Sequence, residues 1–364
     1  MRMRRFGWIV SVVGSLMLVL TGLPGGLLGA GTASASAASP TVTGPVTGGK
    51  GSPYLFSTNF NLSQVDYRQS EYFLSGTATS YAPTAPLTTD GKWAVTPSTT
   101  ASYTTRIVVN RPAKAKNFNG TVIVEWLNVS GGVDAAPDWT LTHNELVRDG
   151  FIWVGVSAQA VGVNAAKSAD PARYASLSHP GDSFSYDMFS QAGQAIRDNA
   201  TLILGGVTPH KVIAIGESQS AGRLVSYIDA VHPLVHVYDG FLVHSRFASG
   251  AALSQAPQPS VPAPATAMIR DDLNVPVFVF ETETDVAGSN LADRQPDTSK
   301  FRLWEVVGSS HYDYYGLSIG PGDIGNGQGA VLNLAAEQHP TNSPAGGFTC
   351  NLPINTGGTH WVLM

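Results

Sequence analysis

Cysteine is nearly absent from this chain, because Cys350 is the only one among its 364 residues. A single thiol cannot form an internal disulfide, so we expect a fold held by its hydrophobic core and an inert, partly buried Cys350. Charge is also scarce, since 13% of the residues are charged and the formal net charge is −5. A nucleic-acid partner usually demands a basic face. The composition therefore argues against binding to nucleic acid.

Long apolar runs are missing beyond the N-terminus, so no later segment is expected to span a bilayer. The N-terminus itself has a basic start, Met1–Arg5, followed by an apolar stretch and by small residues up to Ala37. This order predicts a signal peptide over 1–37, cleaved near Ala37 or Ala35, and a secreted bacterial protein without a stable membrane anchor. Glycines and Pro24 interrupt the apolar stretch, which disfavours the alternative of a retained anchor.

The remaining sequence alternates between segments typical of strands and segments typical of helices. Residues 38–52 are rich in Thr, Ser, Gly and Pro and predict a flexible leader, and 53–364 are expected to form a single domain. Antiparallel strands are predicted at 72–78 and 103–109. Buried strands are then predicted at 121–128, 151–157, 212–215, 240–244, 277–280 and 301–308, with helices at 138–148, 186–199 and after residue 218. This order predicts an α/β fold with a mostly parallel central sheet, helices on both faces and N-terminal antiparallel strands.

The most informative segment is Val212–Gly222, in which four apolar residues run into Gly-Glu-Ser-Gln-Ser and a helical pattern follows. A serine at such a strand–turn–helix junction lies on strained backbone beside the amide groups of a helix N-terminus. Both features activate a nucleophile, so we predict that Ser218 is one. Ser220 is the alternative nucleophile, because as the central serine of a Gly-x-Ser-x-Gly motif it would be followed by the usual last glycine, Gly222. Ser220 would, however, lie within the first helical turn.

Two further side chains follow later strands in the order that a serine hydrolase requires, with the acid before the histidine. Asp285 follows the strand predicted at 277–280, and His311 follows the last strand. His311 would take the proton of the serine and Asp285 would hold the imidazole, with Glu283 as the alternative acid. Both loops are expected at the edge of the sheet where the parallel strands end, which is where open α/β sheets bind their ligands.

Backbone amides for a developing oxyanion are expected from two places. One is Gln219, directly after the serine. The other is the loop after the strand predicted at 121–128, where Val129 is favoured and Asn128 and Ser130 are alternatives. Two glycines in that loop let its backbone approach a substrate closely. The sequence contains no metal-ligand motif and no phosphate-binding glycine loop, so neither a metal nor another cofactor is expected.

These motifs resemble those of the α/β-hydrolase superfamily, and more narrowly those of a family of secreted bacterial α/β-hydrolase-domain proteins with a Gly-Glu-Ser-Gln-Ser turn. The matching segments are 120–132, 156–159, 216–224, 283–285 and 304–311. The resemblance covers most of the chain from about residue 55 onward. It implies the α/β-hydrolase fold and ester-cleaving chemistry, without a substrate. It also implies that a helix starting near Gly357 continues in related proteins, so that this chain is truncated.

The sequence as a whole favours a secreted serine hydrolase that cleaves carboxylic esters through an acyl-serine intermediate, acting on a small-molecule or polymeric ester. An acyltransferase or a peptidase would use the same residues, and a non-catalytic binding protein on this scaffold is a further alternative. Residues 245–275 are rich in Pro, Ala and Ser and are predicted to form an insertion or a lid. The aromatic candidates for the core or for a substrate pocket are Trp126, Trp139, Tyr312, Tyr314 and Tyr315.

Overall fold

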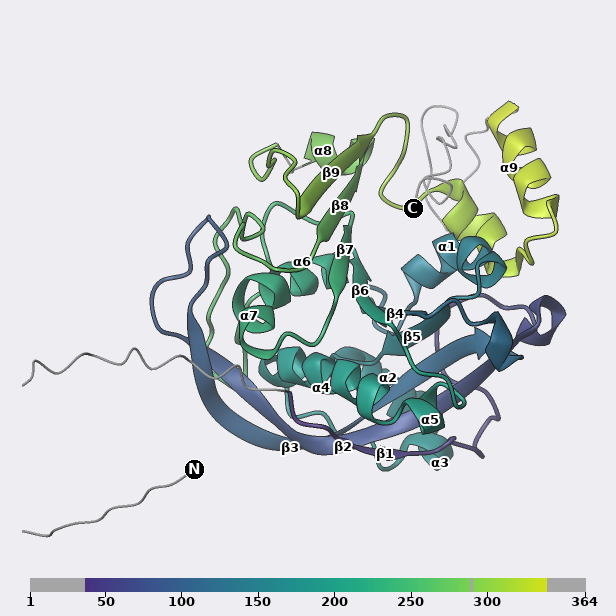
Figure 1. The fold of residues 1–364 in the computed structure, drawn as a ribbon, viewed down its shortest axis with the longest axis horizontal. Coiled ribbons are helices and arrows are strands. Elements are labelled where there is room, and N and C mark those ends of the chain that lie inside the picture. The colour runs from purple at the N-terminus through teal and green to yellow at the C-terminus, as the bar shows by residue number, and fades with distance from the viewer. Residues whose placement is uncertain (1–36, 289–290, 339–364) are drawn as a thin grey trace, which may run out of the picture. The chain divides into compact units, whose positions relative to one another are not determined.

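The structure is a computed structural model and describes residues 37–288 and 291–338. Nine strands within these residues form one sheet: β1 (Thr41–Thr43), β2 (Tyr67–Pro83), β3 (Val95–Pro112), β4 (Thr121–Trp126), β5 (Ile152–Val156), β6 (Lys211–Glu217), β7 (Gly240–His244), β8 (Val277–Thr282) and β9 (Phe301–Val306). Their order across the sheet is β1-β2-β3-β5-β4-β6-β7-β8-β9. β1, β2, β3 and β5 are paired in antiparallel fashion, whereas β5, β4, β6, β7, β8 and β9 run parallel to their neighbours (Figure 1).

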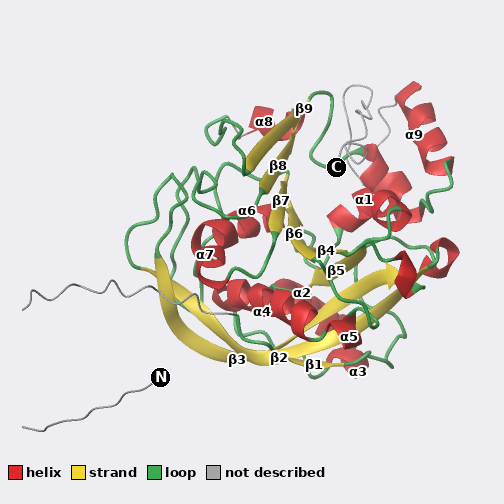
Figure 2. Ribbon diagram, in the orientation of Figure 1, coloured by secondary structure: helices red, strands yellow, loops and turns green. Residues whose placement is uncertain are grey.

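Helices connect the parallel strands and cover the sheet. They are α1 (Pro137–Arg148), α2 (Ala160–Ala169), α3 (Pro171–Tyr174), α4 (Ser185–Asp198), α5 (Ala200–Ile203), α6 (Gln219–Ser226), α7 (His232–Val235), α8 (Glu283–Gly288) and α9 (Gln328–Gln338). Figure 2 shows α4, α6 and α7 on one side of the row of parallel strands and α1 on the other. The predicted α/β class, with a mostly parallel sheet and antiparallel strands at its start, is confirmed.

The central strands are buried on both faces, which is why their sequences are nearly continuous apolar runs. Every residue of β5 is buried, and in β4 Val122, Val124 and Trp126 have no exposed surface. Trp126 packs against Phe189 of α4, with ring centroids 4.7 Å apart. Of the two roles open to Trp126, the structure therefore gives it the core.

The antiparallel strands are longer than predicted. The ladder between β2 and β3 runs from the pair Tyr67–Pro112 to the pair Pro83–Val95, with an irregularity between Thr79 and Tyr81. At the start of β3 most side chains are exposed and polar. Because pairing with a neighbouring strand rather than burial stabilises such a segment, its sequence carries no apolar alternation.

Residues 38–52 differ from the flexible leader that their composition predicts. β1 lies within them and pairs with β2, placing Thr41 opposite Ser75. Further along, the amide of Val46 donates to the carbonyl of Glu71 at 2.8 Å, and the amide of Lys50 donates to Asp170 Oδ2 at 2.6 Å. The backbone of the segment is thus tied to β2 and to Asp170, which lies between α2 and α3, and a composition rich in Gly, Ser and Pro does not disclose this.

Three expectations fall outside the described residues. These are the signal peptide over 1–37, of which only Ala37 is described, the inert thiol of Cys350, and the truncated helix from Gly357. Among the helices that are described, none has the length and apolar character needed to cross a bilayer.

Candidate active site

Ser218 lies in the turn between β6 and α6, on a backbone that a serine rarely adopts. Its φ is 59° and its ψ is −118°. Its amide donates to the carbonyl of His244 at the end of β7, at 2.9 Å. Gly216 permits the tight turn, because a Cβ at this position would lie 3.0 Å from the carbonyl oxygen of Ser220. The geometry is that of a side chain raised above the end of a parallel sheet.

Ser220, the alternative nucleophile, is fully buried and points into the turn. Its hydroxyl donates to the carbonyl of Glu217 at 2.8 Å, and the amide of Glu217 lies 3.1 Å from the same oxygen. The hydroxyl thus closes the turn from within and occupies the place of the glycine that is usual here.

The structure brings Ser218, His311 and Asp285 into one chain of contacts. His311 Nε2 lies 2.7 Å from Ser218 Oγ, and His311 Nδ1 lies 2.6 Å from Asp285 Oδ1. The other carboxylate oxygen, Asp285 Oδ2, accepts from the amide and the hydroxyl of Thr282 at 2.8 and 2.7 Å. Burial alone would raise the pKa of Asp285, but the hydrogen bonds from His311 and Thr282 outweigh it and hold that pKa below its ordinary value. Asp285 is therefore a carboxylate, suited to orient an imidazole.

Glu283, the alternative acid, does not contact the imidazole. Its side chain is exposed, and its Oε2 accepts from the amide of Gly308 at 2.6 Å. Beside it, the amide of His311 donates to the hydroxyl of Thr284 at 2.7 Å. Glu283 and Thr284 thus hold the loop that carries His311, while Asp285 reaches the ring.

The hydrogen bonds in the loop after β4 distinguish the three candidates for the second oxyanion donor, Asn128, Val129 and Ser130. The amide of Asn128 donates to the carbonyl of Ala135 at 2.9 Å, and the amide of Ser130 donates to Asn128 Oδ1 at 2.8 Å. Within the described part of the chain, no hydrogen bond uses the amides of Val129 and Gln219. These two amides are consequently the ones available to a substrate oxygen.

The family is decided by comparison with known sequences. The model of the family called alpha/beta hydrolase domain matches residues 42–364. The chain belongs to this family. The α/β-hydrolase fold expected from the sequence is thereby confirmed, together with membership of the superfamily. A search of curated protein sequences returned no match.

Solved structures similar to this α/β hydrolase include three esterases. The rice cell wall degrading esterase LipA from Xanthomonas oryzae is 10% identical, with 75% of this chain and 91% of that chain covered and a TM-score of 0.36. A thermostable esterase from Pseudomonas putida is 13% identical, with 76% and 83% covered and a TM-score of 0.37. A structure from an analysis of two esterases of Rhizomucor miehei is 13% identical, with 72% and 82% covered and a TM-score of 0.34.

A cluster of buried acids lies behind the serine of this α/β hydrolase. Glu125 accepts from the amides of Asp138 and Trp139 at the start of α1, at 3.1 and 2.9 Å. Asp138 Oδ1 lies 2.8 Å from Nδ1 of the buried His244. Burial and the charge of Asp138 raise the pKa of Glu125 and of Glu217 well above the ordinary value. No motif in the sequence predicts this cluster, and its one sequence signal is the glutamate inside the apolar run of β4.

Phe247 stands beside the imidazole at the start of the 245–275 segment. Its side chain is 51% exposed, and its ring centroid lies 6.1 Å from that of His311. The segment is anchored to the helix after the serine, because the amide of Ala251 donates to the carbonyl of Gly222 at 2.8 Å. It therefore contributes an apolar surface next to the site, and its action as a lid stays a prediction.

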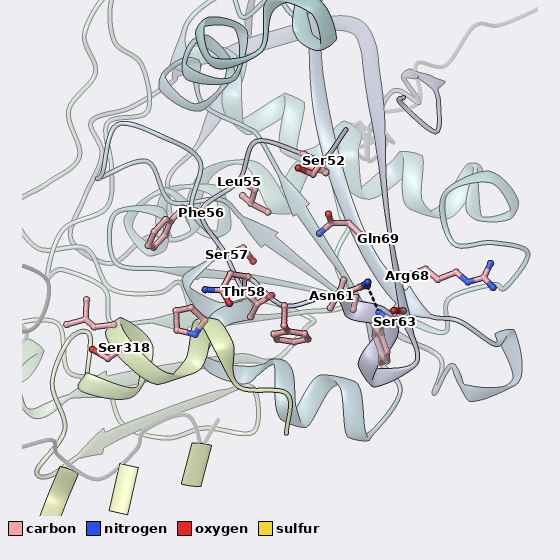
Figure 3. Close-up of a pocket in the computed structure, with 17 residues that line it drawn as sticks. Ser52, Leu55, Phe56, Ser57, Thr58, Asn61, Ser63, Arg68, Gln69 and Ser318 are labelled. Carbon is pink, nitrogen blue, oxygen red and sulfur yellow. Dashed lines mark hydrogen bonds between the residues drawn. The ribbon is translucent and has the colours of Figure 1, made fainter. Parts of the chain in front are cut away.

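A large cavity of about 1080 Å³ lies between residues 52–69 and residues 317–321 (Figure 3). None of Ser218, His311 and Asp285 lines it. Nor, in the described part of the chain, do three or more His, Cys, Asp or Glu side chains gather where they could hold a metal ion.

Proposed function

We propose that this α/β hydrolase is a secreted serine esterase that cleaves carboxylic esters through an acyl-serine intermediate. One observation carries the proposal: Ser218 Oγ, His311 and Asp285 form a continuous series of contacts of 2.7 and 2.6 Å. The three side chains follow three different strands, β6, β8 and β9, and packing alone does not require them to form this arrangement. It suits the removal of a proton from a serine hydroxyl.

In the acylation step Ser218 Oγ attacks the carbonyl carbon of the ester, and its proton passes to His311 Nε2. Asp285 stabilises the imidazolium through Nδ1. The carbonyl oxygen becomes an oxyanion, which the amides of Gln219 and Val129 are placed to bind. When the carbon–oxygen bond to the alcohol breaks, His311 Nε2 returns the proton to the departing alkoxide. The products are a free alcohol and the ester of Ser218.

In the deacylation step water replaces the alcohol. His311 Nε2 takes a proton from the water as its oxygen attacks the acyl carbon, and Ser218 Oγ recovers that proton when it departs. A carboxylic acid is released. The family, whose name denotes hydrolases, supports a hydrolytic reaction. The exposed ring of Phe247 offers an apolar contact for the acyl or alcohol group of an ester.

Labelling with a fluorophosphonate tests the nucleophile, because this reagent phosphonylates a serine only where a base activates it. Wild-type protein is expected to be labelled and Ser218→Ala to be unlabelled. Ser220→Ala is the matched control, since it removes a serine hydroxyl two residues away and should retain labelling. Labelling that survives in Ser218→Ala would show that another residue is the nucleophile.

A panel of p-nitrophenyl esters, compared with p-nitroanilides of the same acyl groups, tests the reaction class. Hydrolysis of the esters without measurable release from the anilides is expected for an esterase. Enzymatic release from the anilides that is lost in Ser218→Ala would instead indicate a peptidase, because a peptidase cleaves the more reactive esters as well. Recovery of the protein from the medium of a bacterial host, with its N-terminus near Ala37, tests the proposed secretion.

A further inference from the structure

Glu217, the residue before the serine, lies under the imidazole as well as in the turn. Its Oε1 is 3.5 Å from His311 Nε2, on the side of the ring opposite to the Asp285 contact. Its side chain is 5% exposed. The imidazole is therefore approached at both ring nitrogens by carboxyl groups, of which only that of Asp285 belongs to the proposed triad.

The position of Glu217 is fixed by neighbours on two elements. Asn128 Nδ2 donates to the carbonyl of Glu217 at 3.0 Å and lies 3.2 Å from its Oε2. Ser220 holds the same backbone through its hydroxyl. Asn128 is itself held by Ala135 and Ser130. These contacts hold the backbone and one carboxyl oxygen of Glu217, and the other carboxyl oxygen, Oε1, lies 3.5 Å from the ring.

The surroundings of Glu217 favour its neutral form. Burial raises the pKa of Glu217, and the negative charges of Asp138, Asp285 and Glu125 raise it further, while the hydrogen bond from Asn128 lowers it. Asp138 faces it from α1, Asp285 from α8 and Glu125 from β4. Its surroundings thus stabilise the neutral carboxyl group, whose carbonyl oxygen accepts hydrogen bonds.

We propose that Glu217 is a positioning residue for His311. The carboxyl oxygen of Glu217 is a second acceptor for the proton on His311 Nε2. The proposal rests on the proposed esterase function. Once Ser218 Oγ has given its proton to Nε2 and joined the acyl carbon, it is a weak acceptor. Glu217 and Asp285 then hold the ring between them until the alkoxide takes the proton. Glu217 itself neither gains nor loses a proton, and a neutral oxygen binds the Nε2 proton weakly enough to release it to the alkoxide.

Two substitutions separate this role from a merely structural one. Glu217→Gln retains a carbonyl oxygen at the same chain length, whereas Glu217→Met retains the length and removes the acceptor. For p-nitrophenyl acetate, kcat is expected to fall about fivefold to tenfold in Glu217→Met at unchanged KM, the effect of one hydrogen bond. Glu217→Gln is expected to remain within about twofold of wild type, with the same pH profile of kcat/KM.

The control is Gln191→Met, which removes a buried polar side chain of α4 that bonds Tyr103 and does not touch His311. It is expected to leave kcat unchanged, and thermal unfolding verifies that all variants fold. Equal kcat in Glu217→Gln and Glu217→Met would overturn the role of the acceptor oxygen. If kcat fell equally in both variants and the acidic limb of the pH profile of kcat/KM also shifted, a negative charge on Glu217 would be required, and this result would overturn the proposal too. Wild-type protein that a fluorophosphonate does not label would instead refute the esterase function itself.

Discussion

Gly216 is the residue on which the serine turn depends most directly. A Cβ at Gly216 would lie 3.0 Å from the carbonyl oxygen and 3.1 Å from the carbonyl carbon of Ser220. Both atoms belong to backbone, so neither can rotate away as the end of a flexible side chain can. The close approach of β6 to α6 and the φ of 59° at Ser218 are thus parts of one turn. Local strain of this kind is common where a side chain must be held for reaction.

Substitution of Gly216 by alanine is therefore expected to be destabilising. We expect Gly216→Ala to lower the free energy of unfolding by about 1–3 kcal/mol, as overpacking does, and to lower kcat/KM by displacing Ser218. Gly222→Ala is the matched control, because a Cβ there meets nothing closer than the amide nitrogen of Ala251 at 3.7 Å. Within α6 it should stabilise the protein by up to about 1 kcal/mol. A change in the free energy of unfolding, measured by urea denaturation, that has the same sign in both variants would contradict this prediction.

Glu217 also makes stability depend on pH. In the folded protein, burial and the charge of Asp138 raise its pKa above the unfolded value of about 4.3. Between the two pKa values the folded state keeps a proton that the unfolded state has lost. The free energy of unfolding then falls as the pH rises, by about 1.4 kcal/mol per pH unit for a single group. Stability from this group is thus fully present below the unfolded pKa and lost as the pH rises towards the folded pKa.

Glu217→Gln has no proton to lose over this range. Relative to wild type, we expect its free energy of unfolding to increase between about pH 5 and about pH 8, because only the wild type is destabilised by the rise. Urea denaturation at the two pH values measures the difference. A difference between variant and wild type that is the same at both values would mean that Glu217 is ionised in the folded protein.

At the scale of elements, the parallel strands could be predicted closely and the antiparallel ones could not. The strand predicted at 240–244 coincides with β7, and that at 277–280 falls inside β8. Both are apolar because the sheet is covered on two faces. The outer parts of β2 and β3, and all of β1, are stabilised mainly by pairing with neighbouring strands, and pairing leaves little trace in hydrophobicity.

In the candidate site, too, one part could be predicted from the sequence and another could not. The proximity of Ser218, Asp285 and His311 could be predicted, since each follows its own strand and parallel strands end at one edge. The acids behind them could not, because the burial of Glu217 depends on α1 and β4, which are distant in sequence. The sequence favours Val129 among the three loop amides, and the hydrogen bonds made by the amides of Asn128 and Ser130 leave the amide of Val129 as the available one.

The segment between β7 and β8 is expected to affect substrate preference through Phe247. Phe247→Ala removes the half-exposed ring beside His311, and the lost apolar contact should lower kcat/KM for p-nitrophenyl butyrate about fivefold to tenfold, mainly through KM. The effect should be smaller for the acetate, which offers less apolar surface. Phe56→Ala is the control, because Phe56 is 64% exposed and lines the large cavity instead. Equal losses for acetate and butyrate would argue against an apolar contact.

At the scale of the whole molecule, a buried ion network joins the antiparallel strands to the loop of the candidate site. Arg106 of β3 contacts Glu71 of β2 at 3.0 Å and Asp134 of the loop after β4 at 2.7 Å, and all three side chains have no exposed surface. Arg173 of α3 approaches Glu71 at 2.6 Å. Asp134 precedes Ala135, whose backbone bonds Asn128. The network thus connects the N-terminal strands with the loop that carries Val129.

Breaking this network should affect the entire fold. Arg106→Met leaves Asp134 buried without its cation, and we expect it to lower the free energy of unfolding by about 3–5 kcal/mol, because an unpaired buried charge remains. Arg148→Met is the control: Arg148 pairs with Glu145, but its side chain is 65% exposed, and exposed pairs contribute about 1 kcal/mol or less. Urea denaturation of both variants measures the contrast. A loss below about 1 kcal/mol for Arg106→Met would show that Ser157, whose hydroxyl donates to Asp134 at 2.6 Å, and the surrounding dipoles suffice to hold the carboxylate.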